Sequence, residues 1–317
     1  MSAFTRVAVW LTHPEVPCFK FEARHGARLE HELPGCTVPH CLNQTAFLRA
    51  LPDAEAVLVW KFRQEWFARA PALRLVATPA AGTDYFSVTP PPHVQLSYGA
   101  FHGELMAETV LALMLGVSRG VIATALLQAR KPWPRRLLAP QMHPLRGAHI
   151  AILGFGHIGT WIGRLVKPCG VRITGVKQTP AAWPPYFQLG DRIATVDRLD
   201  EVLPDTDHLV LCLPRTPQTD RLLDARRLSL LPPRAVVYNV GRGNAIDEAA
   251  LAAALSAGAL RGACLDVYEH EPLPADSALR RCPNVLLMPH AAAIAPNYMD
   301  LFVGEFVARY RGGDCRT

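Results

Sequence analysis

Residues 149–166 read HIAILGFGHIGTWIGRLV, and this stretch decides the fold. An apolar run typical of a buried strand leads into Gly154, Gly156 and Gly159, after which an amphipathic helical pattern begins. Gly154 permits a tight turn, Gly156 lets the backbone approach a pyrophosphate, and Gly159 lets helix and strand pack closely. The stretch therefore predicts a dinucleotide-binding unit. The alternative is a tight strand–helix turn that binds no ligand.

The residues after the glycines bear on the choice of dinucleotide. The helix would present the amides of His157 and Ile158 to the phosphates at its N-terminus. About 20 residues further on, an NAD-binding site carries an acid for the ribose hydroxyls, but here GVKQTP (175–180) places Lys177. A lysine attracts a ribose 2′-phosphate, so the sequence predicts that NADP(H) is preferred and NAD(H) possible. Alternatively, Lys177 is a solvated residue at a strand end with little influence on cofactor choice.

Composition places the chain among globular proteins. It has 317 residues, of which half are hydrophobic and 19% charged, enough for two domains. The net charge is +6, but Lys and Arg are scattered, so nucleic-acid binding is not expected. The eight cysteines form no C-x-x-C pair and several lie in apolar runs, which favours reduced, buried thiols. No complete set of metal ligands is visible, and no metal site is predicted.

The apolar stretches of the sequence do not predict a signal peptide or a membrane span. The N-terminal stretch has a five-residue apolar core followed by Thr, His and Pro, which predicts a first strand and not a signal peptide. The longest apolar stretch, 105–127, is interrupted by Glu108 and Arg119. We therefore expect a cytoplasmic protein without a membrane span.

Short apolar runs alternate with helix-like segments in two parts of the chain. Runs rich in Val, Ile and Leu are typical of parallel strands buried on both faces, so two parallel α/β sheets are predicted. The runs are VAVWL (7–11), AVLVW (56–60) and LRLVAT (73–78), then AHIAIL, VRITGV, HLVLCL, AVVYNV, GACLDV and VLLMP within 148–288. A long helical pattern over 103–129 and a proline-rich arm connect the two parts. A last helical stretch, about 297–311, is expected to pack on the first domain.

Three strand ends carry residues suited to reducing a 2-oxo acid. Arg242, Glu271 and His290 each follow a predicted strand of the second sheet, at the edge where α/β proteins bind ligands. A guanidinium can grip a carboxylate and polarise the adjacent carbonyl. An imidazolium can protonate the carbonyl oxygen as a nicotinamide delivers hydride, and a neighbouring carboxylate stabilises that imidazolium. Each residue also has a structural alternative, and Glu269 is a rival for the role of Glu271.

With these residues in view, the sequence resembles the D-isomer-specific 2-hydroxyacid dehydrogenases, and among them the glyoxylate/hydroxypyruvate reductases. The resemblance extends from about residue 79 to residue 296. Besides the glycine turn, it rests on motifs whose order and spacing match: LPRTPQT (213–219), NVGRGNAIDEAAL (239–251), LDVYEHEPLP (265–274) and PHAAA (289–293). It implies that Arg242 binds the substrate's carboxylate and carbonyl, that Glu271 pairs with His290, and that His290 is the general acid.

The resemblance also implies further contacts. AAGTD (80–84) looks like the family's substrate-carboxylate loop, which puts the amides of Ala81 and Gly82 on the carboxylate. Trp60 and its neighbour Lys61 are weaker candidates for lining the substrate pocket. Three other residues match positions that line the adenosine and the nicotinamide: Pro214, Val240 and Asp266.

The implied architecture is two Rossmann-like or flavodoxin-like α/β domains with a cleft between them. Residues 1–99 and 290–317 would form the substrate domain, and 100–289 the dinucleotide-binding domain. The helix expected over 103–129 and the proline-rich arm after it look like the family's dimer interface, so a homodimer is expected. The favoured activity is reduction of a small 2-oxo acid to the D-2-hydroxy acid. The alternatives are an NAD-linked dehydrogenase of D-lactate type and a non-catalytic dinucleotide-sensing scaffold.

Overall fold

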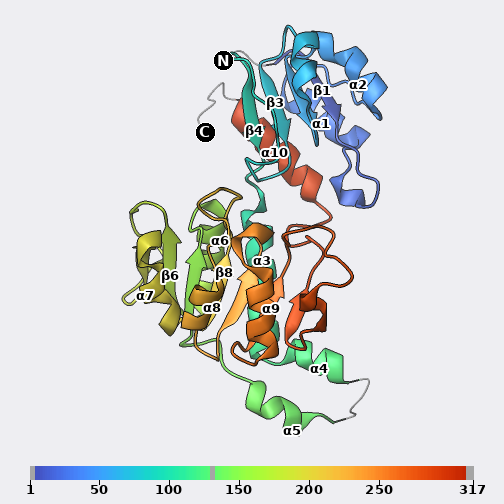
Figure 1. The fold of residues 1–317 in the computed structure, drawn as a ribbon. Coiled ribbons are helices and arrows are strands. Elements are labelled where there is room, and N and C mark those ends of the chain that lie inside the picture. Colours follow the sequence, from blue (N-terminus) through green and yellow to red (C-terminus); the bar gives the residue numbers. More distant parts are fainter. Residues whose placement is uncertain (1–3, 129–132, 312–317) are drawn as a thin grey trace. The chain divides into compact units, whose positions relative to one another are not determined.

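The computed structural model describes residues 4–128 and 133–311, which form two compact α/β units (Figure 1). Unit 1 is Met1–His102 with Ile294–Thr317, and unit 2 is Gly103–Ala293. The sequence places these boundaries after residues 99 and 289. Each unit is built on its own all-parallel sheet, which confirms the predicted α/β class.

Unit 1 contains a four-stranded sheet in the order β1-β2-β3-β4, with helices on both faces. A segment at Thr37–His40 adds isolated parallel bridges to the outer side of β1. As expected, the last helix of the chain, α10, packs on this sheet. The elements are β1 Val7–Trp10, β2 Ala56–Val59, β3 Leu75–Thr78, β4 Gln95–Tyr98, α1 Ala23–Glu32, α2 Gln44–Ala50 and α10 Tyr298–Tyr310.

Unit 2 contains a seven-stranded sheet in the order β11-β10-β9-β8-β5-β6-β7. The order reverses at β5, the strand that leads into the glycine turn, and such a switch point is where open α/β sheets bind ligands. Its strands are β5 His149–Leu153, β6 Arg172–Lys177, β7 Arg192–Thr195, β8 His208–Leu211, β9 Val236–Asn239, β10 Gly262–Leu265 and β11 Val285–Leu287. Its helices are α3 His102–Ser118, α4 Val121–Leu127, α5 Arg135–Leu138, α6 His157–Val166, α7 Leu199–Val202, α8 Ala225–Leu230 and α9 Glu248–Ser256.

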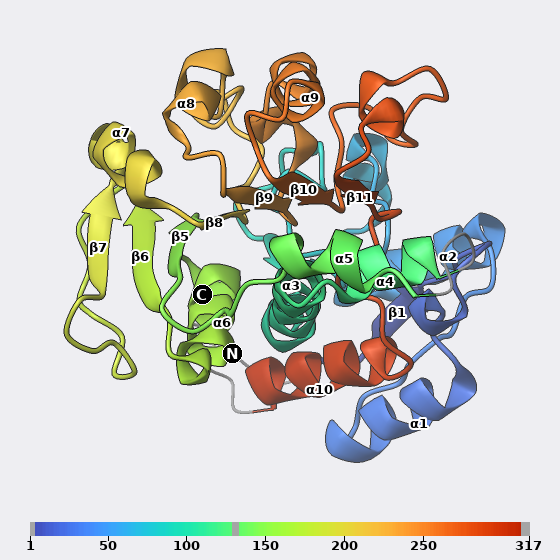
Figure 2. The same cartoon turned by 90° about the horizontal axis from the view of Figure 1, so that it is seen from below.

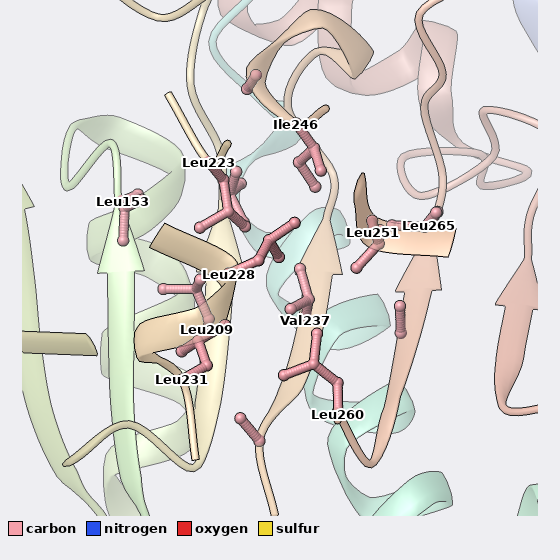
Figure 3. Packing of buried hydrophobic residues seen from close by; sticks show 14 of the residues in the cluster. Leu153, Leu209, Leu223, Leu228, Leu231, Val237, Ile246, Leu251, Leu260 and Leu265 are labelled. Atoms are coloured by element: carbon pink, nitrogen blue, oxygen red, sulfur yellow. The ribbon is translucent and has the colours of Figure 1, made fainter. Parts of the chain in front are cut away.

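The continuous apolar runs are explained by burial on both sides of this sheet. Figure 2 shows α8 and α9 on one face and α3 and α6 on the other. Alternate residues of β5 follow that division: Ala151 and Leu153 pack with α8 and α9, whereas Ile150 and Ile152 pack with α3 and α6. Figure 3 shows the first of these cores, in which leucines from helices meet strand residues such as Val237.

The long helical pattern over 103–129 does not form one helix, so that expectation was wrong. α3 ends at Ser118, and α4 begins after Gly120, whose φ of +65° lies in the left-handed region. The two helices are bent by 65°. Glycine alone adopts this conformation readily, which is why the chain turns here. Part of the pattern, residue 129, and the start of the arm, 131–132, lie outside the described residues.

No single helix in the described ranges is long and apolar enough to cross a membrane; only α3 and α4 taken together satisfy length and composition. The seven cysteines in those ranges are all free thiols, and four of them are buried.

Buried histidines make the stability of unit 2 sensitive to acid. His208 is 5% exposed, its Nδ1 lies 2.9 Å from the Tyr238 hydroxyl, and burial lowers its pKa to about 4. Because the folded protein keeps His208 neutral, its contribution to stability is present above the unfolded pKa of about 6.5 and is lost as pH falls towards 4. The temperature of thermal unfolding should therefore fall as pH is lowered over this window, and less steeply in His208→Asn, whose amide does not titrate. Equal slopes in both proteins would contradict this assignment.

Candidate active site

The three glycines after β5 occupy three different environments. At Gly154, where φ is +88°, an added Cβ would lie 2.6 Å from the carbonyl oxygen of Cys212. At Gly159 it would lie 2.6 Å from the carbonyl oxygen of Gly154. At Gly156, by contrast, no atom lies within 4 Å of that position. The outer two glycines are thus needed for close packing, and the middle one faces open space that a phosphate can approach.

Helix α6 begins beside this open space with its first amides unshielded. Gly156 is its N-cap, and no side chain caps the helix. His157 is exposed and Ile158 half-buried at the first turn. The free N–H groups and the positive end of the helix dipole suit an anion. The turn therefore fits the pyrophosphate of a dinucleotide, as the sequence predicts.

Lys177 lies next to this turn. The amides of Gly154 and Phe155 both donate to the carbonyl oxygen of Val176, at 3.1 and 3.0 Å, so the end of β6 is tied to the glycine turn. Lys177 is the last residue of β6, where its backbone pairs with Thr195 of β7, and its half-buried side chain makes no hydrogen bond or ion pair with any described residue. Its ammonium is available to a ligand bound at the turn.

The other predicted cofactor contacts lie at neighbouring strand ends. Pro214 is exposed after β8, and its carbonyl oxygen accepts a 2.7 Å hydrogen bond from the Thr219 hydroxyl. Val240 follows β9 and is 3% exposed, within the core shared with α3 and α6. Both belong to the carboxyl edge of the sheet, and their contact with a cofactor stays a prediction.

Glu271 and His290 are in direct contact. The Nδ1 atom of His290 lies 2.8 Å from Oε2 of Glu271, and Oε1 of Glu271 accepts a 3.1 Å hydrogen bond from the Tyr268 amide. The rival Glu269 points elsewhere: its carboxylate lies 3.6 Å from Arg221. The structure thus distinguishes two acids that the sequence leaves in competition.

The turn that carries Arg242 is packed backbone against backbone. Asn239, 1% exposed, donates from Nδ2 to the carbonyl oxygen of Arg242 at 3.0 Å and accepts from the Gly241 amide at 3.1 Å. A Cβ on Gly243 would lie 1.8 Å from the backbone of Tyr268. The Arg242 turn is therefore held against the segment that leads to Glu271.

Electrostatics couple these three residues. The hydrogen bond to Glu271 raises the pKa of His290 above 6.5; burial acts against this, the charges of Glu271 and Asp266 add to it, and that of Arg242 opposes it. Burial would raise the pKa of Glu271, but hydrogen bonds from His290 and the Tyr268 amide outweigh it, and the pKa lies below 4.5. Each member of the pair thus favours the charged form of the other, and the Arg242 charge acts on both.

Asp266 has a place that the sequence did not suggest. It is 2% exposed, and its two carboxylate oxygens accept hydrogen bonds from the amides of Ala291 at 2.7 Å and Ala292 at 2.9 Å. Its own carbonyl oxygen accepts the His290 amide at 2.9 Å. The cofactor contact implied for Asp266 stays a prediction, whereas its contacts with the His290 loop are direct.

The remaining predicted residues belong to unit 1. Ala81 and Gly82 follow β3, and their amides donate to no other described residue. Trp60 follows β2; its Nε1 donates to the carbonyl oxygen of Phe19 at 3.2 Å. Lys61 is exposed. Free amides in the 80–84 loop are compatible with carboxylate binding, which stays a prediction for this unit.

Within the described chain, no three His, Cys, Asp or Glu side chains are grouped so that they could hold a metal ion.

Comparison with known proteins identifies similar chains. Residues 111–292 match the model of the D-isomer specific 2-hydroxyacid dehydrogenase NAD binding domain. A glyoxylate reductase of Pyrococcus furiosus is 33% identical over 282 residues, covering 83% of this chain and 80% of that one. A glyoxylate/hydroxypyruvate reductase B of Yersinia pestis is 32% identical over 262 residues, covering 78% and 77%.

Solved structures agree over almost the whole chain. An NADPH-dependent glyoxylate/hydroxypyruvate reductase from Sinorhizobium meliloti, in complex with NADP and sulfate, is 27% identical with a TM-score of 0.76, over 97% of this chain and 95% of that one. A D-isomer specific 2-hydroxyacid dehydrogenase from Xanthobacter autotrophicus, in complex with NADPH and MES, is 28% identical with a TM-score of 0.75, over 99% and 96%.

Proposed function

The chain belongs to the D-isomer specific 2-hydroxyacid dehydrogenases, a family of NAD(P)-dependent oxidoreductases, and from that premise we propose that it reduces glyoxylate to glycolate, or hydroxypyruvate to D-glycerate, with NADPH. The observation that carries this proposal is the 2.8 Å contact between His290 and Glu271, made at the sheet edge that also carries Arg242. The named relatives that reduce glyoxylate and hydroxypyruvate support the choice of substrate.

Each of the three side chains has a defined task in this proposal. Arg242 binds the carboxylate and polarises the adjacent carbonyl. Glu271 holds Nδ1 of His290, which leaves Nε2 of the imidazolium to donate a proton to the carbonyl oxygen. A dinucleotide held at the glycine turn would supply the hydride for the carbonyl carbon. We further propose that the amides of Ala81 and Gly82 bind the substrate carboxylate and that Trp60 lines the substrate pocket.

Cofactor choice is the second part of the proposal. The ammonium group of Lys177 has no hydrogen-bond or ion-pair partner among the described residues, and the residue lies beside the glycine turn. We expect it to bind the 2′-phosphate of NADP(H). Neighbours solved with NADP or NADPH support this preference.

Replacing Lys177 with aspartate should reverse that preference. The carboxylate would repel the 2′-phosphate and accept the ribose hydroxyls of NADH. A hydrogen bond to a charged group contributes about 1.5–3 kcal/mol, so KM for NADPH should rise about 10- to 100-fold, with kcat for NADH little changed. Initial rates with each cofactor measure this. Unchanged KM for both would remove Lys177 from the site.

The region of α3, α4 and α5 supports a homodimer. Large apolar side chains are exposed along α3, α4 and α5 and the residues beside them: Leu115, Val121, Leu126, Trp133, Leu137 and Met142. A second copy of this chain would cover them. Light scattering after size exclusion measures the mass directly, and a monomer would reject this part. A cytoplasmic location, consistent with the free thiols, belongs to the same proposal.

The activity itself is tested by oxidation of NADPH and of NADH with glyoxylate and with hydroxypyruvate. Turnover of either oxo acid with a preference for NADPH supports the proposal. Turnover only with NADH and pyruvate would favour a dehydrogenase of D-lactate type. Tight NADPH binding without turnover of any 2-oxo acid would favour a dinucleotide-sensing scaffold.

A further inference from the structure

The loop that carries His290 is fastened by two residues within unit 2. Asp266, at the end of β10, accepts the amides of His290, Ala291 and Ala292 through its carbonyl oxygen and its two carboxylate oxygens, at 2.7 to 2.9 Å. In addition, the Thr109 hydroxyl on α3 donates to the carbonyl oxygen of Ala292 at 2.8 Å. The backbone of residues 290–292 is therefore held by the side chains of Asp266 and Thr109 and by the carbonyl group of Asp266.

This fastening acts where the backbone is strained. His290 has a φ of +53°, in the left-handed region that residues other than glycine rarely adopt. Such a conformation persists only where its surroundings hold it, and it is frequent at functional sites. The side-chain direction of His290 depends on this backbone, and the 2.8 Å contact with Glu271 depends on that direction.

We infer that Asp266 is a positioning residue for His290, which it holds in the left-handed conformation that brings Nδ1 onto Glu271. The inference rests on the proposed function, in which His290 is the proton donor. It assigns to Asp266 a role toward the proton donor, whereas the family pattern implies only a contact with the cofactor.

The chemistry of the clamp requires a carboxylate. Two amide N–H groups each need an acceptor, and an ionised carboxylate offers one oxygen to each. An asparagine of the same shape would offer one oxygen and turn its NH2 group toward the other N–H. At a site that is 2% exposed, water does not relieve that conflict.

The charge of Asp266 acts on the same proton. The charged groups that face His290 are Glu271 from the loop after β10, Asp266 from the end of β10 and Arg242 from the loop after β9. The first two favour the imidazolium and the third opposes it. Loss of the Asp266 charge, together with a looser contact with Glu271, should lower the pKa of His290.

The test is Asp266→Asn beside Asp224→Asn. Asp224 accepts the Arg227 amide at the N-cap of α8 and takes no part in the proposed site, so its variant controls for removal of a capping carboxylate. In Asp266→Asn we expect kcat to fall up to about 100-fold, the basic limb of kcat/KM to move to lower pH, and the Kd for NADPH to stay within about twofold. Asp224→Asn should match the wild type in all three.

Two results would overturn the inference. One is a wild-type pH profile and kcat in Asp266→Asn. The other is a loss that is entirely weaker NADPH binding, which would make Asp266 a cofactor contact. Should Asp266→Asn fail to fold, Thr109→Val loosens the same loop without a change of volume or charge. It should lower kcat about 2- to 10-fold, the value of one hydrogen bond, and shift the pH profile in the same direction; wild-type behaviour would reject the clamp.

A measurement without turnover separates this inference from the proposed function. An NMR titration of the His290 imidazole gives its pKa in the wild type and in each variant. A lower pKa in Asp266→Asn supports the clamp even if no 2-oxo acid is reduced, in which case only the proposed function fails. An unchanged pKa in an active enzyme leaves the proposed function standing and rejects the clamp.

Discussion

Replacing His290 with alanine should lower kcat for 2-oxo acid reduction about 10²- to 10⁴-fold, because the carbonyl oxygen loses its proton donor. NADPH binding should change little, since the glycine turn and α6 are untouched. Steady-state kinetics and a fluorescence titration with NADPH measure the two effects. His270→Ala is the matched control: His270 is exposed and adjacent to Glu271 in the chain, and it should keep wild-type kinetics.

The pH dependence of the wild type should identify the same proton. Reduction requires protonated His290, whose pKa is raised above 6.5 by Glu271, so kcat/KM should be level in acid and fall as pH rises through that raised pKa. Glu271→Gln keeps the shape and removes the charge, and its fall should begin at lower pH. A profile that rises with pH, or one that Glu271→Gln leaves in place, would contradict the role of the pair.

Replacing Arg242 with alanine is expected to lower kcat/KM about 30- to 5000-fold, the range for deleting one partner of a buried charged contact. KM for the oxo acid should rise because the carboxylate loses its guanidinium, and kcat should fall because the carbonyl is less polarised. Arg242→Lys keeps the charge without the planar fork and should recover only part of the loss. Full activity in Arg242→Ala would limit the residue to a structural role.

A matched surface variant, Arg226→Ala, is the control for Arg242→Ala. Arg226 lies in the same unit, is exposed, and pairs with Asp200 at 2.7 Å. Arg226→Ala removes one positive charge without touching the sheet edge, so its kcat/KM should equal that of the wild type. A comparable loss in Arg226→Ala would point to the net charge of the unit and not to the position of Arg242.

The buried strands were predictable from the sequence, whereas two of the edge strands, β4 and β7, were not. A strand covered on both faces needs an unbroken apolar run, and such runs are visible in the sequence as VLVW and HIAIL. β4 (QLSY) and β7 (RIAT) are edge strands whose side chains are mostly half-exposed or exposed. An edge strand needs no such run, and the polar residues of β4 and β7 interrupt the apolar pattern by which a strand is recognised.

The break in the long helix and the side chains that hold the site loops were harder to predict than the candidate catalytic residues. Gly120 inside an apolar helical pattern is compatible with a continuous helix, and only tertiary packing decides that it turns left-handed. Likewise, Arg242, Glu271 and His290 stand out because strand ends carry function. The clamp at Asp266 depends on which backbone amides cross its carboxylate, and Asn239 depends on the turn it spans. No residue spacing in the sequence indicates the contacts of Asp266 or of Asn239.

The most direct test of the central claim is the product formed from hydroxypyruvate and NADPH. Chiral chromatography of the glycerate, together with the amount of NADPH oxidised, reports reaction, cofactor and stereochemistry at once. We predict D-glycerate in a 1:1 ratio to the NADPH consumed. L-glycerate, or NADPH consumed without glycerate, would contradict the assignment of this chain's site to D-specific reduction of a 2-oxo acid.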